Sequence, residues 1–123
     1  MKLTIFRAAL LLAVSLGVAV VSTRAQTEPT AGSYRQMAVS SKEARAAAAV
    51  AVKNHSSTHP KDTVRLVKIL NAEEQVVAGM NYRICMVVKN RKGVRRTVTA
   101  VVYQPPNHKM RSTDWSAGSC KDI

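Results

Sequence analysis

The chain of 123 residues has few of the side chains from which most active sites and metal sites are built. It contains two cysteines, three histidines, one tryptophan, three tyrosines and one phenylalanine. The histidines lack the spacing to cysteine or aspartate that is typical of a metal site, and we expect His55, His59 and His108 in solvated loops. We find no phosphate-binding loop, no paired carboxylates placed to form a pocket, and no catalytic motif around Cys85. The sequence therefore predicts neither an enzyme nor a metal or cofactor site.

Acidic residues are also scarce, with seven Asp and Glu against 19 Lys and Arg. A basic protein is attracted to anionic glycans, membranes or an acidic protease, although the charge also favours simple solubility. The densest group follows Lys89, and the candidates for contact with anionic surfaces are Arg91, Lys92, Arg95 and Arg96. This segment could bind a heparin-like glycan or a nucleic acid. We favour the alternative that it is a solvated hairpin turn. No aromatic residue interleaves with the charges, so no specific nucleic acid is predicted.

The first 25 residues have the features of a secretory signal peptide. Lys2 and Arg7 precede an apolar run over residues 8–21, and Ala25 is a small residue suited to cleavage. The rival interpretation is a signal anchor, but the run is shorter than the ~20 residues a membrane helix needs. Cleavage predicts a secreted, extracellular chain without a membrane span. Loss of three basic residues with the signal lowers the net charge from +12 to +9.

The remaining chain is long enough for one small domain. Residues 26–39 are predicted to form a flexible N-terminal arm and the first strand, and residues 40–123 the rest of the domain. Ser40 and Glu43 form a capping box that predicts the start of a helix. The helix runs through the alanine-rich stretch 44–52 and is expected to end near Asn54, which begins a glycosylation sequon.

Two apolar runs, residues 63–70 and 82–88, predict a strand hairpin. Alternation in the second run places Tyr82, Ile84, Met86 and Val88 on the helix side. Further strands are expected over residues 97–104 and 109–115, separated by a break at Pro105.

An even pair of cysteines in a secreted chain implies a disulfide between Cys85 and Cys120, with two free thiols as the alternative. A turn centred near Arg91 and Lys92 would place Cys85 opposite Val98 on the following strand. A single bridge would help a domain with a small core.

The tip of the first hairpin is exposed and apolar, and reads Gln75-Val76-Val77-Ala78-Gly79, followed by Asn81-Tyr82. Together with Gly32, which lies 43 residues before Gln75, and with the order of the predicted elements, this stretch resembles the cystatin family. The resemblance covers residues 31–120. It implies an α+β fold with one long helix wrapped by a curved four- to five-stranded antiparallel sheet.

The resemblance implies a reversible, tight-binding inhibitor of papain-like cysteine endopeptidases. In the family, a glycine arm and two hairpin loops fill the protease cleft. The matching positions here are Gly32, Gln75, Val76, Val77, Ala78, Gly79, Pro105, Pro106 and Asn107. The second loop of the family carries Pro-Trp, whereas Pro106 or Asn107 stands here in place of the Trp. The alternative is a secreted basic binding or host-defence module that has the fold without protease inhibition.

Overall fold

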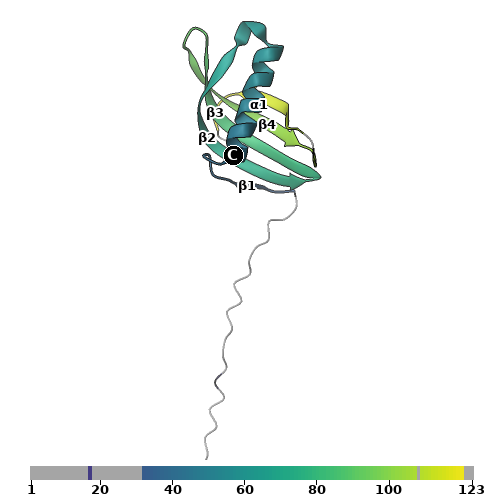
Figure 1. Ribbon diagram of the computed structural model, residues 1–123. Coiled ribbons are helices and arrows are strands. Elements are labelled where there is room, and N and C mark those ends of the chain that lie inside the picture. Colours follow the sequence, from purple (N-terminus) through teal and green to yellow (C-terminus); the bar gives the residue numbers. More distant parts are fainter. Residues whose placement is uncertain (1–16, 18–31, 108, 121–123) are drawn as a thin grey trace, which may run out of the picture.

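The computed structural model describes residues 17, 32–107 and 109–120. One helix lies across one face of a curved antiparallel sheet, whose strands follow each other in the order β1-β2-β3-β4-β5 (Figure 1). This confirms the predicted fold class. The elements are β1 (Tyr34–Gln36), α1 (Lys42–Thr58), the 3-10 turn η1 (Pro60–Asp62), β2 (Val64–Val77), β3 (Gly79–Asn90), β4 (Arg95–Gln104) and β5 (Arg111–Ala117).

Helix α1 begins one residue later and ends four residues later than predicted. Its N-cap is Ser41, not Ser40, and the Ser41 hydroxyl accepts a hydrogen bond from the backbone N–H of Ala44 at 3.1 Å. The helix continues past Asn54 to Thr58, because Pro60 is the first residue that cannot extend it. The sequon asparagine is therefore an exposed helical residue.

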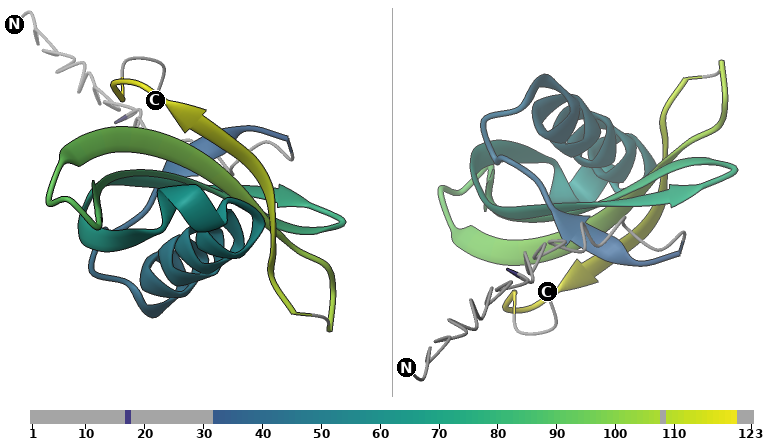
Figure 2. Two further views of the ribbon diagram at one scale, coloured as in Figure 1. Left: turned by 90° about the horizontal axis from the view of Figure 1, so that it is seen from above. Right: turned by 90° about the horizontal axis from the view of Figure 1, so that it is seen from below.

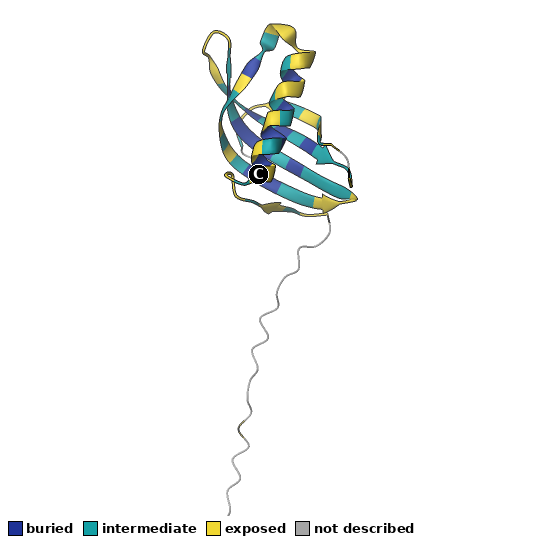
Figure 3. Ribbon diagram, in the orientation of Figure 1, coloured by how far each residue is buried: buried dark blue, intermediate teal, exposed yellow. Residues whose placement is uncertain are grey.

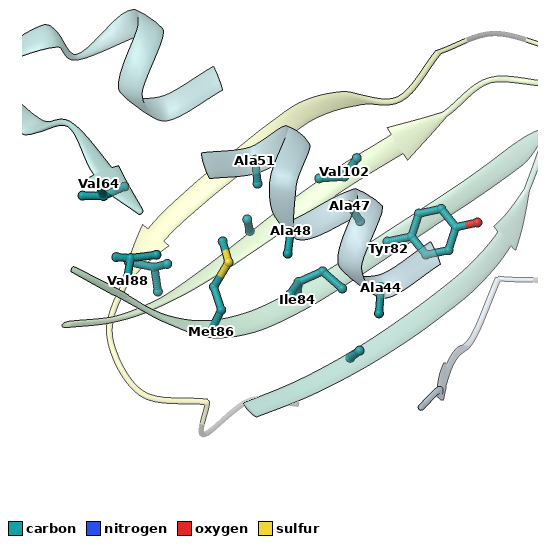
Figure 4. Close-up of a cluster of buried hydrophobic side chains, with 13 residues drawn as sticks. Ala44, Ala47, Ala48, Ala51, Val64, Tyr82, Ile84, Met86, Val88 and Val102 are labelled. Carbon is teal, nitrogen blue, oxygen red and sulfur yellow. The ribbon is translucent and has the colours of Figure 1, made fainter. Parts of the chain in front are cut away.

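The core lies between α1 and the central strands (Figure 3). Four helix alanines are fully buried, and small side chains there let the helix approach the sheet closely. They belong to the same buried cluster as Ile84 and Met86 of β3, and Figure 4 shows Ala48 pointing toward Ile84. The prediction that alternate residues of β3 face the helix is confirmed, because all four of them are buried in this core: Tyr82, Ile84, Met86 and Val88.

The β2–β3 hairpin is longer than predicted on both sides of its tip. Strand β2 runs unbroken from Val64 to Val77, and β3 from Gly79 to Asn90. The sequence Asn71 to Glu74 has little strand propensity, but its backbone is held by pairing with β3 and, at Glu73 and Glu74, also with β1. Two register shifts in the first half of β2 add twist, which suits a sheet that curves around the helix.

The extra helical turn carries His55 into the interior, which corrects its predicted place in a solvated loop. Its ring is buried and stacks on Trp115 of β5 with centroids 4.1 Å apart, and its Nε2 lies 2.8 Å from Asp62 Oδ2. Asp62 also accepts hydrogen bonds from both terminal guanidinium nitrogens of Arg96. The bonds from Arg96 and then from His55 hold the pKa of Asp62 far below its usual value. This cluster joins the end of α1 to β4 and β5.

Cys85 and Cys120 form a disulfide with their Cα atoms 5.8 Å apart, the pairing predicted from the even cysteine count. Cys85 is fully buried and lies opposite Thr99, so the predicted partner Val98 is wrong by one residue. The slip arises because the β3–β4 turn is centred on Lys92 rather than between Arg91 and Lys92.

The predicted signal peptide of residues 1–25 lies outside the described residues apart from Gly17, as does the stretch 26–31 of the predicted arm. Where the structure is described, we find no helix with the length and apolar character needed to cross a membrane.

Candidate functional site

Three segments that are distant in the sequence meet at one edge of the molecule. They are the chain at Gly32, the tip between β2 and β3, and the loop Pro105–Asn107 between β4 and β5. Both views in Figure 2 show the tip and the loop projecting from the same end, and the chain enters β1 beside them. All nine residues predicted to contact a protease belong to these segments, so the fold brings together what the sequence separates.

The tip is narrower than a loop of five residues. Gln75, Val76 and Val77 still belong to β2, only Ala78 is a bend, and Gly79 already begins β3. The side chains of Val76 and Val77 are nonetheless exposed, with relative accessibilities of 42% and 39%. The end of β2 thus presents two successive apolar side chains to solvent, which point to opposite faces of the hairpin.

Gln75 connects the tip to the N-terminal segment. Its Nε2 donates a hydrogen bond to the backbone carbonyl of Gly32 at 2.7 Å, and its Oε1 accepts one from Asn81 Nδ2 at 2.9 Å. Gly32 has a φ of 102°, a conformation that favours glycine. The side chain of Gln75 therefore holds the chain entering β1 against the hairpin. Asn81, noted in the sequence only as part of the resemblance, proves to orient Gln75.

The tip is also fastened to the second loop. The hydroxyl of Tyr103, the penultimate residue of β4, donates to the carbonyl oxygen of Ala78 at 2.5 Å. Gly79 has a φ of 105°, and a Cβ there would overlap the carbonyl oxygen of Gln104 and lie 3.2 Å from the Cα of Pro105. Sequence reasoning missed these supports, because neither Tyr103 nor Gln104 belongs to a motif. Gly79 is needed for packing within the chain, whatever it contacts in a partner.

Replacing Gly79 with alanine is expected to lower the free energy of unfolding by about 3 kcal/mol, since the residue carries both an unfavourable φ and a backbone overlap. Gly93 is the matched control. Its φ is also positive, at 83°, but a Cβ there would have no neighbour within 4 Å. Gly93→Ala should therefore cost only about 1 kcal/mol. Urea unfolding of both variants measures the difference, and equal losses would show that the contact between tip and loop is not tight.

The β4–β5 loop begins where two prolines end the strand. Pro105 is half-buried, and Pro106 and Asn107 are exposed, whereas His108 lies outside the described residues. Asn107 has a φ of 60°, in the left-handed region that asparagine tolerates and bulky residues avoid. A tryptophan, the residue usual in this loop of the resembled family, would thus fit the backbone better at position 106 than at 107.

The four basic residues predicted to contact anionic surfaces do not share one face. Arg91, Lys92 and Arg95 are exposed. Arg96 is half-buried and turns to the helix side, where it binds Asp62. Its guanidinium group thus already has an acidic partner, and its contact with an anionic surface stays a prediction.

The described side chains offer little for covalent or metal chemistry. Both cysteines are bridged, so neither supplies a thiolate nucleophile. Within residues 32–107 and 109–120, no three His, Cys, Asp or Glu side chains are grouped as metal ligands. What this edge offers is shape, two exposed valines and hydrogen bonds that hold the tip against the N-terminal segment and the end of β4.

The sequence and the fold of this chain are similar to those of known proteins. A family model, SQAPI, described as aspartic acid proteinase inhibitor, matches residues 37–114. The crystal structure of a salivary cystatin from the soft tick Ornithodoros moubata has a TM-score of 0.58 and 18% identity, over 72% of this chain and 98% of that one. The crystal structure of Al-CPI has a TM-score of 0.60 and 17% identity, over 71% and 100%. No curated protein matches the sequence. The chain has the cystatin fold and belongs to SQAPI, a family of cystatin-like proteinase inhibitors.

Proposed function

We propose that the chain is a reversible, tight-binding inhibitor of papain-like cysteine endopeptidases. The inhibitor inserts the edge described above into the active-site cleft of the protease. The tip lies in the middle, the N-terminal segment on one side and the β4–β5 loop on the other. The contacts are assigned to Gly32, Gln75, Val76, Val77, Ala78, Gly79, Pro105, Pro106 and Asn107. The observation that supports this most is that hydrogen bonds join the tip to the N-terminal segment and to Tyr103, two residues before the β4–β5 loop, within the free chain.

These hydrogen bonds favour binding because they order the edge before a partner arrives. A flexible loop loses conformational entropy on association, at about 0.5–1.5 kcal/mol for each immobilised side chain. Here the Gln75 side chain already bonds Gly32 and Asn81, and the carbonyl of Ala78 is held by Tyr103. Most of that cost is therefore met during folding.

The tip supplies apolar area to the interface. Val76 and Val77 are exposed in the free chain and would be removed from water in a cleft, at about 25 cal/mol per Å² of apolar surface. In the proposed complex these non-covalent contacts alone hold the protease, so the complex dissociates with the chain intact.

Secretion forms part of this proposal. It is supported by the predicted signal peptide and by the disulfide, because disulfides persist mainly in oxidising compartments. The protease partner would then be met outside the cytosol.

A second candidate is inhibition of an aspartic proteinase, and the printed description of the matching family favours it. The matched residues 37–114 include the tip and the second loop but begin after Gly32. A net charge of +9 in the processed chain would also suit a cleft built around two aspartates. In this mode the N-terminal segment would not be required.

The two candidates are separated by titrating the processed protein, residues 26–123, against papain near neutral pH and against pepsin in acid. Reversible inhibition of papain alone supports the first candidate. Inhibition of pepsin alone overturns it in favour of the second. A folded sample that inhibits neither enzyme at tens of micromolar supports the alternative of a basic binding or host-defence module. Repeating each titration at high salt shows how much of the affinity is electrostatic.

A further inference from the structure

Three cationic side chains stand in a row across the sheet, at the end opposite the candidate protease-binding edge. Arg65 of β2 pairs directly with Lys89 of β3, and Lys89 pairs directly with Arg95 of β4. Directly paired residues share a face of the sheet, and strands lie ~4.8 Å apart, so the row spans about 10 Å. The neighbour Val88 is buried against the helix, so the row lies on the other face.

No acidic residue of the described chain neutralises this row. The described ion pairs use Glu74 with Arg35, Glu73 with Arg83, and Asp62 with His55 and Arg96. Like charges placed directly opposite each other across strands destabilise a sheet. The row therefore repels itself in the free chain, and an anion bound along it would relieve that repulsion.

A hollow of about 250 Å³ adjoins the row between the start of β2 and the β3–β4 turn. Arg65 and Lys89 line it, so two of the three cations face a concave surface rather than open solvent. The other lining residues are Thr63, Val64, Asn90, Arg91 and Gly93. Lys68 pairs with Val87 on the same face as Lys89, which extends the positive surface along β2.

We propose that the row Arg65, Lys89 and Arg95 is a binding site for a linear sulfated polysaccharide, with the hollow receiving one sulfate group. Arginine guanidinium groups suit sulfate because they donate paired hydrogen bonds to two of its oxygens. A single-stranded nucleic acid fits less well, because such sites stack bases on aromatic side chains. The aromatic residues of the described sheet lie away from the row. Tyr34 pairs with Gln75 and Tyr103 with Asn81, near the opposite end of the sheet, and Trp115 is stacked on His55.

The glycan site and the protease-binding edge are far enough apart to be occupied together. Lys89 follows Gly79 by ten residues along β3, which corresponds to about 33 Å. A glycan on the row would hold the protein on a sulfated matrix and leave its opposite edge free. The inference does not depend on protease inhibition, and its test is independent of that function.

The test measures binding of a heparin hexasaccharide by calorimetry to the processed protein at physiological salt. The variant Arg65→Gln, Lys89→Gln, Arg95→Gln removes the row. The matched control Lys42→Gln, Arg45→Gln, Lys53→Gln removes the same charge from exposed helix positions. We expect the row variant to bind at least tenfold more weakly and the control to stay within twofold of the parent. The hexasaccharide should also raise the Tm of the parent and the control, but not of the row variant.

Equal weakening by both variants would show that only net charge matters, and would overturn the site. The same holds if the parent does not bind the hexasaccharide at all. Phosphatidylserine vesicles and a single-stranded oligonucleotide serve as competing probes. If either binds more tightly than the hexasaccharide and shows the same dependence on the row, the proposed ligand is wrong and the row serves that polyanion instead.

Discussion

Replacing Val77 with aspartate is expected to weaken inhibition by at least about 100-fold, or ~2.7 kcal/mol, while leaving the fold intact. Val77 is exposed at the last position of β2, so an aspartate there stays solvated in the free protein. In a complex the same carboxylate would be taken out of water without a positive partner. Burial of an unpaired charge is among the largest penalties that one substitution can introduce.

Val94→Asp is the matched control for this variant. Val94 is an exposed valine with 58% relative accessibility, and it lies in the turn at the other end of β3. The substitution makes the same change in charge and hydrophobicity at a site far from the proposed edge. Inhibition constants for both variants, with thermal unfolding to check the fold, measure the contrast. If Val94→Asp weakens inhibition as much as Val77→Asp, the tip is not the contact surface.

Local pattern was sufficient to predict the helix, the strands and their order, but not their ends. The ends depend on partners that are distant in the sequence. Strand β2 extends through Asn71 because β3 holds it, and the helix passes Asn54 because Ser56 reaches across to the backbone of Val64, with hydrogen bonds of 3.1 Å in both directions. Propensity alone favours a break at both asparagines, and tertiary contacts override it.

The candidate site was predictable to the extent that it is a contiguous motif. Gln75 to Gly79 could be placed on a hairpin tip from the two flanking apolar runs. The bond from Gln75 to Gly32, the bond from Tyr103 to Ala78 and the overlap that excludes a side chain at Gly79 all join separate segments. Such contacts need the register of the sheet, which a single sequence does not specify.

The charged surfaces illustrate the same limit. Arg95 and Arg96 are adjacent in the sequence, yet one lies in the cationic row and the other binds Asp62 on the helix side. Arg65 lies 24 residues before Lys89 and becomes its direct neighbour only through pairing of β2 with β3. A charge cluster in sequence and a charge cluster in space are therefore different sets of residues in this protein.

Loss of the disulfide is expected to cause the largest change in stability. The bridge from Cys85 to Cys120 spans a sequence separation of 35, for which the chain-entropy model gives about 3–4 kcal/mol. In a domain of this size that corresponds to a fall in Tm of about 15–25 °C. Cys120→Ala is the better variant, since Cys85 is fully buried and its replacement would add a cavity to the loss.

Two measurements test whether the bridge stabilises the domain and whether it also positions the proposed edge. Reduction of the parent protein should lower the Tm as much as Cys120→Ala does, and the reduced variant should show no further loss. Inhibition at a temperature where the variant is still folded should be unchanged, because Cys85 lies six residues along β3 from Gly79, about 20 Å from the tip. A variant that keeps its Tm would show that the sheet and helix alone stabilise the domain. A variant that stays folded but loses inhibition would show that the bridge positions the protease-binding edge.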